Sequence, residues 1–542
     1  MKHHLCWNKP RVLPLTHSTL PWIQLCVIVL VTISAVVAGF AVIIADTSVQ
    51  GSLVIGEQKN LWFSISYFLL IATIVPIANW SADRFGQKCV FFIGSVFLLI
   101  PTLFCAWTTN YWVMMVFRSL SALGAGSIFP TSLTLIDLAF PPKQKTFAIA
   151  IYIAAAFGIG TTGGIFLGGY CAEFIGWPVI FMWIAAPAPL AFLAIWLFFP
   201  ETEKKRGISF DLIGTFFYLI LIGSLVTGLS DFKQPWNTEG IDSKLIILSA
   251  VLFILSFYGF IWRESTASQP LMNISLFKIR PFCLGNIAIF IVGSTFFSTS
   301  TNLTKIFETD LLYSKYHLSL LQLPLGICIG IFGALSGLLS KKVGIRPLAT
   351  MGMVLVSISC FTNHSITIQS DHAQYLWLQV LRGTGIGMAL GPFTALALKR
   401  IRPENIGQAA VIITIFRQFG GALGGIIIDL IRNIRFPFHL LRFGEQMSLT
   451  SPALERHLDA TDTFLTDQAG CIPAVIPGVS EGFTEAASVR GLAELREYAA
   501  AQADILSIND GYWLIGWVAS VTLVIITFFM LRAWWHERQH TP

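Results

Sequence analysis

The sequence predicts an all-α integral membrane protein. Only 12% of its 542 residues are charged and 55% are hydrophobic, whereas soluble domains carry about 25% charged residues. The apolar residues gather in runs of ~20 residues or more, which is the length of helix that crosses the ~30 Å hydrocarbon core of a bilayer. Fourteen such spans are expected, near residues 22–45, 60–80, 89–108, 111–140, 147–171, 179–199, 211–230, 244–263, 282–302, 318–339, 347–366, 374–398, 407–430 and 511–532.

Lysine and arginine residues indicate the orientation of these spans, because basic loops stay on the cytoplasmic side. With the N-terminus inside, 21 of these residues fall in the inner segments and five in the short outer loops. We therefore expect both termini in the cytoplasm and a multi-pass protein of the cell membrane, with a bacterial inner membrane favoured. No A-x-A-like cleavage site follows the basic Met1–Arg11 stretch, so the first run is interpreted as a retained span.

The sequence contains no pattern of metal-binding or nucleotide-binding residues that would indicate an enzyme. The nine cysteines are scattered, with no C-x-x-C pattern and no cysteine–histidine cluster, so no metal site is predicted. No phosphate-binding loop or nucleotide site is visible. We therefore expect no catalytic residue, no cofactor and no nucleic-acid partner. The expected partners are the lipid bilayer and a small-molecule substrate, with an ion gradient as the energy source.

The most informative residue is Arg118, which lies inside the apolar run Tyr111–Phe140. An ionisable side chain within a span is costly, indicates a functional site and needs a partner. Asp46 is the candidate partner, because both residues lie toward the outer ends of their spans. A pair that keeps Asp46 ionised, and that protonation breaks, would couple a proton to a conformational change. The alternative is a fixed buried ion pair that only orders the bundle.

Two further arginines, Arg382 and Arg417, also interrupt apolar runs. Arg382 occupies a place in its span that resembles the place of Arg118. Arg417, together with Gln418, is expected either to line a cavity in the second half of the chain or to hold its span in position. For the acids near the ends of spans a solvated, gating or capping role is expected; these are Asp137, Glu173, Glu308, Asp310 and Asp429.

A turn after the second span carries a family signature. It reads Asn79-Trp80-Ser81-Ala82-Asp83-Arg84-Phe85-Gly86-Gln87-Lys88 and resembles the G-x-x-x-D-R-x-G-R-R motif of the major facilitator superfamily. A degenerate copy, Gly337 to Arg346, follows the tenth span, as expected of a transporter built from repeats. Glycine permits the tight turn. The resemblance implies a cytoplasmic gate formed by Asp83, Arg84, Gly86 and Lys88.

Further segments resemble, in the same order along the chain, motifs of the fourteen-span drug:proton antiporters of the EmrB/QacA type. They are Ile44–Ser48 at the end of span 1, Arg118 with Gly124 and Gly126 in span 4, the antiporter-motif glycines Gly160, Gly164, Gly168 and Gly169 in span 5, and Arg417–Gly424 in span 13. Ile165 stands where the span 5 motif has a proline. Close helix packing is the alternative to a role in antiport for these glycines.

The resemblance implies the major facilitator fold, with two six-helix bundles and an inserted two-helix hairpin. The expected boundaries are 1–21 for a cytoplasmic N-terminus, 22–200 for the first bundle, 201–281 for the hairpin of spans 7 and 8 with its linkers, 282–532 for the second bundle and 533–542 for a cytoplasmic tail. A long outer loop, 431–510, lies between the last two spans. It contains a helix-like stretch from Glu481 to Ile508, so we expect a small helical cap or disorder.

The resemblance further implies a secondary transporter that expels hydrophobic or amphipathic drugs and toxic compounds in exchange for protons, by alternating access. In a host with two membranes it implies a periplasmic adaptor protein and an outer-membrane channel as partners. A carrier of a metabolite or siderophore, or an uptake system, is an alternative that Ile165 favours. A non-transporting scaffold or sensor is a third. Unused charges in a membrane are costly, and four residues argue against this third reading: Asp46, Asp83, Arg118 and Arg417.

Overall fold

The computed structural model describes residues 19–200, 202, 204, 209–232, 237, 239–267, 269–446, 456 and 479–539. Within these residues, thirteen helices are long and apolar enough to cross a membrane. The remaining expected span corresponds to α15 (His372–Leu398), which is less apolar because it carries Arg382 and four glycines. The predicted all-α membrane fold is confirmed.

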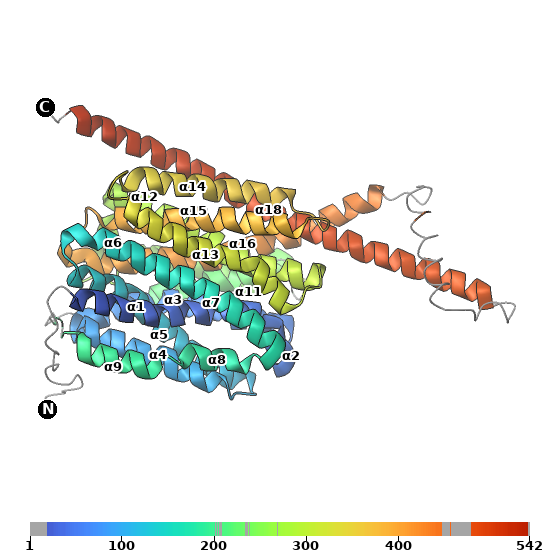
Figure 1. Ribbon diagram of the computed structural model, residues 1–542, viewed down its shortest axis with the longest axis horizontal. Helices are drawn as coiled ribbons and strands as arrows, with labels where there is room; N and C mark the ends of the chain where they lie inside the picture. The colour runs from blue at the N-terminus through green and yellow to red at the C-terminus, as the bar shows by residue number, and fades with distance from the viewer. Residues whose placement is uncertain are drawn as a thin grey trace.

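The first half of the chain forms one helical bundle (Figure 1). Its elements are α1 (Leu20–Ile44), α2 (Asp46–Leu53), α3 (Glu57–Phe85), α4 (Gln87–Cys105), α5 (Tyr111–Ala139), α6 (Pro142–Ile153), η1 (Ala154–Ile159), α7 (Gly160–Tyr170), η2 (Cys171–Ile175), α8 (Pro178–Ala185) and α9 (Ala188–Phe198). α5 packs on α3 and α4, and α1 packs on α7. The π-helical turn η1 joins α6 and α7 into one span, and Pro187 separates α8 from α9.

The second half forms the other bundle, and its last helix is the longest of those described. Its elements are α12 (Arg280–Lys305), η5 (Ile306–Asp310), α13 (Lys315–Leu339), α14 (Ile345–Thr362), η6 (Asn363–Ser365), α15, η7 (Pro403–Asn405), α16 (Ile406–Gln446) and α18 (Val479–Gln539). α12 packs on α16, α13 and α14 pack on α15, and α18 packs on α14 and α16. The beginning of α1 and the end of α18 lie at the same end of the molecule (Figure 1).

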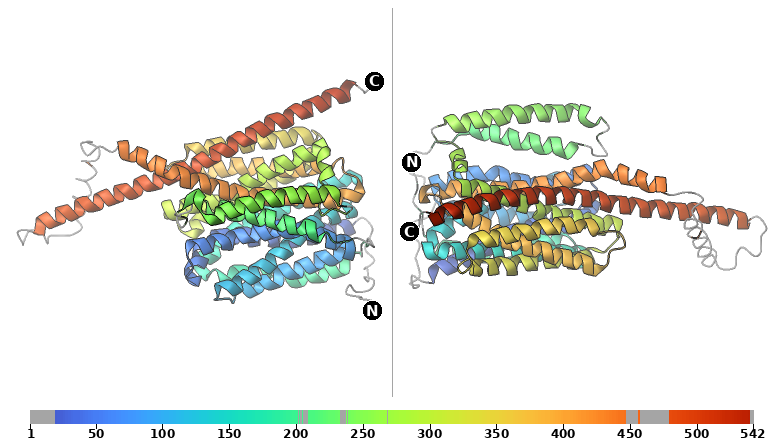
Figure 2. Two further views of the ribbon diagram at one scale, coloured as in Figure 1. Left: turned by 180° about the vertical axis from the view of Figure 1, so that it is seen from behind. Right: turned by 90° about the horizontal axis from the view of Figure 1, so that it is seen from above.

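A hairpin of two helices connects the two halves and lies to one side of them, as the right-hand view of Figure 2 shows. Its elements are α10 (Leu212–Asp231), η3 (Gly240–Asp242), α11 (Lys244–Thr266) and η4 (Ile274–Lys278). Asp211 caps α10 by accepting a hydrogen bond from the Gly214 amide at 3.0 Å, and it pairs with Arg263 of α11 at 2.9 Å. The Tyr218 hydroxyl donates to the Ala72 carbonyl at 2.8 Å, which fixes the hairpin against α3.

The segment 431–510 differs from the expected loop. α16 continues to Gln446, and α18 already begins at Val479, so both helices extend past the rest of the bundle (Figures 1 and 2). The residues between them, apart from Arg456, lie outside the described part of the chain. The apolar runs end where a membrane would end, but the polar residues that follow are good helix formers and do not end the helix. Ion pairs join the two extensions: Arg432–Asp504 at 2.5 Å, Arg435–Asp510 at 2.6 Å and His439–Asp510 at 2.8 Å.

The two halves meet chiefly where α6, η1 and α7 pack on α13 and where α3 and α5 pack on α16. Glycine makes the contact between η1 and α13 possible, since a Cβ atom on Gly158 would lie 2.3 Å from the Cα atom of Gly330. We call the end of the bundle where α1 stops the Asp46 end. The opposite end, which holds the turn between α3 and α4, is the Asp83 end.

Candidate functional site

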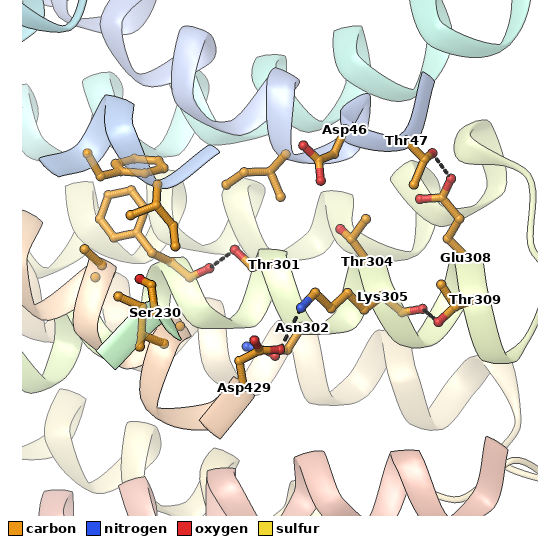
Figure 3. Close-up of a pocket in the computed structure, with 18 residues that line it drawn as sticks. Asp46, Thr47, Ser230, Thr301, Asn302, Thr304, Lys305, Glu308, Thr309 and Asp429 are labelled. Carbon is orange, nitrogen blue, oxygen red and sulfur yellow. Dashed lines mark hydrogen bonds and ion pairs between the residues drawn. The ribbon is translucent and has the colours of Figure 1, made fainter. Parts of the chain in front are cut away.

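A cavity of about 130 Å³ lies between the two halves at the Asp46 end (Figure 3). The end of α1, α2 and α3 form one wall, and α12, η5 and α16 form the other. Its lining combines charged and hydroxyl side chains with apolar ones: Ile43, Asp46, Thr47, Ile65, Phe68, Ser230, Phe297, Thr301, Asn302, Thr304, Lys305, Glu308, Thr309, Gly421, Ala422, Gly425, Ile426 and Asp429. Apolar walls combined with placed polar groups are a feature of sites that bind small molecules.

Asp46 faces this cavity from the first residue of α2. α1 ends at Ile44 and the chain bends at Ala45, so Asp46 begins a new helix, where a negative charge is favourable. Its carboxylate accepts a hydrogen bond from the Asn60 side chain at 2.8 Å, and Asn60 also donates to Gln50 at 3.1 Å. The carboxylate is therefore held by a neutral donor and remains on the cavity wall.

The predicted ion pair between Asp46 and Arg118 is not formed in this conformation, among the residues that the structure describes. The Arg118 side chain is 1% exposed and donates to the Ala38 carbonyl at 2.9 Å. Its guanidinium lies 4.1 Å from the centre of the Tyr67 ring. Ala38 precedes Asp46 by eight residues, which is about 12 Å along a helix. The guanidinium of Arg118 thus bonds α1 about two turns before Asp46, and a carbonyl, an aromatic face and the nearby charge of Asp46 compensate its charge.

Sequence reasoning missed the residues that form the opposite wall. Lys305 of α12 pairs with Asp429 of α16 at 2.7 Å (Figure 3). Glu308 and Asp429, which were expected at membrane–water interfaces, line the cavity instead. The available signal was Lys305 and Glu308, placed three residues apart after a run of Ser and Thr. Such a spacing puts two side chains on one face of a helix.

Contacts near the mouth of the cavity join the two halves. Thr47 of α2 donates a hydrogen bond to Glu308, and Lys315 of α13 donates to both of these residues, with a 2.6 Å ion pair to Glu308. The backbone amide of Lys315 also donates to Glu173 of η2 at 3.1 Å. These contacts must break if the halves separate at the Asp46 end. The side chain of Asp310 lies outside the described part of the structure.

Four phenylalanines form a layer beneath the cavity, which we call the Phe layer: Phe40, Phe68, Phe296 and Phe297. The ring centres of Phe68 and Phe297 are 4.8 Å apart, and those of Phe40 and Phe296 are 4.9 Å apart. Phe40 and Phe68 belong to the first half, whereas Phe296 and Phe297 belong to the second. The Phe layer therefore closes the space between the halves below Asp46.

Arg382 and Arg417 occupy different environments, although both are buried. Arg382 donates hydrogen bonds to Asn363 at 2.8 Å and to the Ser359 carbonyl and Thr299 hydroxyl at 3.2 Å. It lies away from the cavity lining and is part of the packing of the second half. Arg417 extends from α16 to the other half, where its guanidinium lies 4.4 Å from the centre of the Phe157 ring. Like its neighbour Gln418, it lies below the cavity lining and is buried.

The antiporter-motif glycines bring helices together. A Cβ atom added to Gly160 would lie 2.8 Å from the Cβ of Val36. One added to Gly164 would lie 2.9 Å from the Cβ of Phe40, and one added to Gly168 would lie 2.6 Å from the carbonyl oxygen of Ala41. These three glycines pack α7 against α1, the helix that ends beside Asp46. The fourth, Gly169, faces the other half instead, where a Cβ atom would lie 2.4 Å from the Cβ of Ser319 on α13.

The Gly169→Ala variant is expected to lower the free energy of unfolding by ~1–3 kcal/mol, the typical effect of overpacking a tight contact. The added methyl also meets the Lys315 carbonyl oxygen at 2.6 Å, and backbone cannot move aside as a flexible side chain can. Thermal unfolding of the purified protein measures the loss. Gly163→Ala is the matched control, since its nearest neighbour, Val37 Cγ2, is 3.7 Å away. Equal melting temperatures for the two variants would contradict the close contact between α7 and α13.

At the Asp83 end, the signature turn and its copy share one backbone feature. Gly86 has φ +101° and Gly344 has φ +92°, a conformation that favours glycine at both positions. Gln87 donates its amide proton to the Thr202 hydroxyl at 2.6 Å, and the Lys88 ammonium donates to the Trp196 carbonyl at 3.4 Å. The first turn is thus bound to the end of the first bundle.

Cationic residues of both turns contact aromatic rings. The Arg84 guanidinium lies 5.3 Å from the centre of the Trp80 ring. The Lys341 ammonium of the second copy lies 4.4 Å from the centre of the Phe147 ring on α6, which joins the halves at this end. Asp83 lies in the last turn of α3, and Asp137 pairs with Lys145 at 2.7 Å.

The sequence matches the Major Facilitator Superfamily over residues 25–425. The chain belongs to this superfamily. Members of the family are transporters, and the predicted resemblance to the EmrB type is confirmed by relatives at low identity. The multidrug export protein EmrB of Escherichia coli (strain K12) is 24% identical over 78% of this chain and 84% of its own length. The fatty acid resistance protein FarB of Neisseria gonorrhoeae is 24% identical over 81% of this chain and 86% of its own.

A solved structure agrees with the fold of this superfamily member. The proton:xylose symporter XylE superposes with a TM-score of 0.58, over 95% of this chain and 96% of that one, at 13% sequence identity. Such a low identity supports the fold alone. The chain is thus a multi-pass membrane transporter with two packed halves and a cavity between them.

Proposed function

We propose that the protein is a proton-coupled exporter of hydrophobic or amphipathic compounds that works by alternating access. The observation that carries this proposal is the position of Asp46, a titratable group on the wall of a cavity formed by both halves. Membership in the superfamily and relatives named for multidrug export and fatty acid resistance support export as the direction. The basic residues of the segments at the Asp83 end support placing the Asp46 end outside the cell.

In this mechanism, Asp46 binds a proton from outside while the cavity is open at the Asp46 end. Protonation removes the negative charge and the need for the Asn60 donor, so the halves can close over a neutral cavity wall. The Thr47, Glu308 and Lys315 contacts stabilise closure at this end. When the cavity opens at the Asp83 end, approach of Asp46 toward Arg118 releases the proton to the cytoplasm, because a nearby cation favours the ionised carboxylate.

The substrate moves in the opposite direction. It enters from the cytoplasmic side and leaves when the Asp46 end opens, so the proton gradient is the energy source and no cofactor takes part. We place the protein in a bacterial inner membrane with both termini in the cytoplasm. The extensions of α16 and α18 then project outside the cell, where a periplasmic adaptor and an outer-membrane channel could continue the export path.

The test is a proteoliposome assay with an imposed proton gradient. Internal pH is followed while lipophilic cations, weak acids and small metabolites are added one at a time. We expect proton movement that depends on at least one hydrophobic or amphipathic compound and on none of the polar metabolites. Proton movement with metabolites alone would replace export of amphipathic compounds by metabolite transport. No proton movement with any compound, in protein shown to be folded, would overturn proton coupling.

A further inference from the structure

Arg417 is a buried cation for which the described residues supply no hydrogen-bond acceptor. Its side chain is 1% exposed, and its Nε and Nη2 atoms have no hydrogen-bond partner in the described residues. Within the same residues, no carboxylate forms an ion pair with it. A buried charge without partners is strongly unfavourable. A purely structural role therefore does not explain why an arginine occupies this position.

The other two buried arginines show what a structural role looks like in this fold. Arg118 donates to the Ala38 carbonyl at 2.9 Å, and Arg382 makes three hydrogen bonds. All three guanidinium groups lie over aromatic rings. Arg118 and Arg382 also leave their Nε atoms without a partner, but for Arg417 no donor has an acceptor within the described part of the chain.

The surroundings of Arg417 combine two apolar rings with a phenol hydroxyl, all from the first half. The rings of Phe157 and Phe129 lie 4.4 and 5.1 Å from its guanidinium carbon, measured to the ring centres. Tyr152, on the same side as these rings, is within electrostatic reach of the guanidinium. This is an amphipathic environment located between the two halves.

The site lies directly below the cavity. Arg417 and Gly421 are four residues apart on α16 and share a helix face, and Gly421 lines the cavity. The Phe297 ring packs on Gly421, since a Cβ atom there would lie 2.2 Å from the ring. Phe157 contacts both Arg417 and Phe296 of the Phe layer. The Phe layer therefore separates the guanidinium from the cavity by about one turn of helix.

We propose that Arg417 binds the anionic group of an amphipathic substrate, a carboxylate or comparable oxyanion, while the apolar part of that substrate lies against the Phe layer. The guanidinium offers two unused donors in a planar fork, the geometry that pairs with two carboxylate oxygens. The surrounding rings accept an alkyl or aryl body. This assignment rests on the proposed function for the presence of a substrate, and it adds the class of substrate.

Binding of matched ten-carbon compounds to purified protein in nanodiscs tests this assignment. The probes are decanoate, decanol and decyltrimethylammonium, and the readout is the shift in melting temperature with probe concentration. We expect decanoate to stabilise the wild type, with an affinity at least roughly tenfold lower in Arg417→Gln, as for loss of a charge-assisted pair. Decanol and decyltrimethylammonium should bind both proteins equally. Decanoate binding that is unchanged in Arg417→Gln, or stronger binding of the cation to the wild type, would overturn the assignment.

Two further comparisons keep the test decisive. Without ligand, Arg417→Gln should melt no lower than the wild type, because the variant removes a buried charge that has no acceptor. If Arg417→Gln fails to fold, Arg417→Lys replaces it; this variant keeps the charge, loses the fork and should bind decanoate more weakly than the wild type does. Equal decanoate affinity of the wild type and Arg417→Lys would then contradict a bidentate site.

The outcome is separable from that of the proposed function, because binding requires no proton gradient. Proton-coupled export of cations, with no specific binding of decanoate, would leave the proposed function intact and remove this assignment. Decanoate binding that depends on Arg417, with no proton movement in liposomes, would support this assignment and remove proton-coupled export.

Discussion

In proteoliposomes, the Asp46→Asn variant is expected to lose substrate-driven proton movement down to the background of empty liposomes. Asparagine keeps the size of the side chain and can accept the hydrogen bond from Asn60, but it cannot bind and release a proton. Because the cavity lining is otherwise unchanged, substrate binding should stay within about threefold of the wild type, a difference of less than 1 kcal/mol. Internal pH and a melting-temperature binding assay measure the two quantities.

Asp137→Asn is the matched control for this experiment. Asp137 is also an acid in a predicted span, but it pairs with Lys145 at the Asp83 end and lies outside the cavity lining. It should keep most of the proton movement. Full proton coupling in Asp46→Asn would remove Asp46 as the coupling group, without affecting membership in the superfamily. Equal loss in both variants would indicate a general effect of acid removal on the fold.

Arg382→Gln should cause the largest loss of stability of the three buried arginine positions. The Arg382 side chain joins α12, α14 and η6 through its hydrogen bonds and lies 4.6 Å from the centre of the Tyr512 ring on α18. Its removal takes the donor from the Asn363 side-chain oxygen, whereas the Ser359 carbonyl keeps the Thr362 hydroxyl as a donor. We expect a loss of about 2 kcal/mol or more, since hydrogen bonds to charged groups are strong and buried acceptors left unmade are unfavourable.

Thermal unfolding in one detergent, with Arg417→Gln measured beside it, checks this expectation. The two variants make the same chemical change on different helices, so the comparison isolates the hydrogen bonds. A lower melting temperature for Arg382→Gln than for Arg417→Gln is expected. The reverse order would mean that the hydrogen bonds of Arg382 contribute little and that Arg417 has a packing role.

The parts of the fold that depend on local sequence patterns were predicted from the sequence alone. Apolar runs located the spans, and the spacing of glycine after the second and tenth spans located two turns with positive φ at Gly86 and Gly344. Burial of Arg118, Arg382 and Arg417 followed from their positions within apolar runs. Each of these features is determined within one segment of about 20 residues, so it can be predicted without knowing which other helices pack against that segment.

Features that depend on the relative depth of different helices could not be read in this way. Asp46 and Arg118 are both near outer ends of their spans, yet Arg118 donates to Ala38, eight residues before Asp46, and Asp46 accepts from Asn60 beyond the bend at Ala45. The Lys305–Asp429 pair joins helices that are 124 residues apart in sequence. The ends of α16 and α18 were missed for another reason, since hydropathy indicates the membrane boundary and not the end of a helix.

The central claim is that proton binding at Asp46 changes the separation of the two halves at the Asp46 end. Spin labels on Ser52 of α2 and His317 of α13, both exposed, measure this distance in protein whose other cysteines are replaced and whose transport is retained. The account predicts two distance populations whose ratio changes with pH and with substrate, and a ratio that no longer responds to pH in Asp46→Asn. A single distance that is unaffected by pH and substrate, or a full pH response in Asp46→Asn, would contradict it.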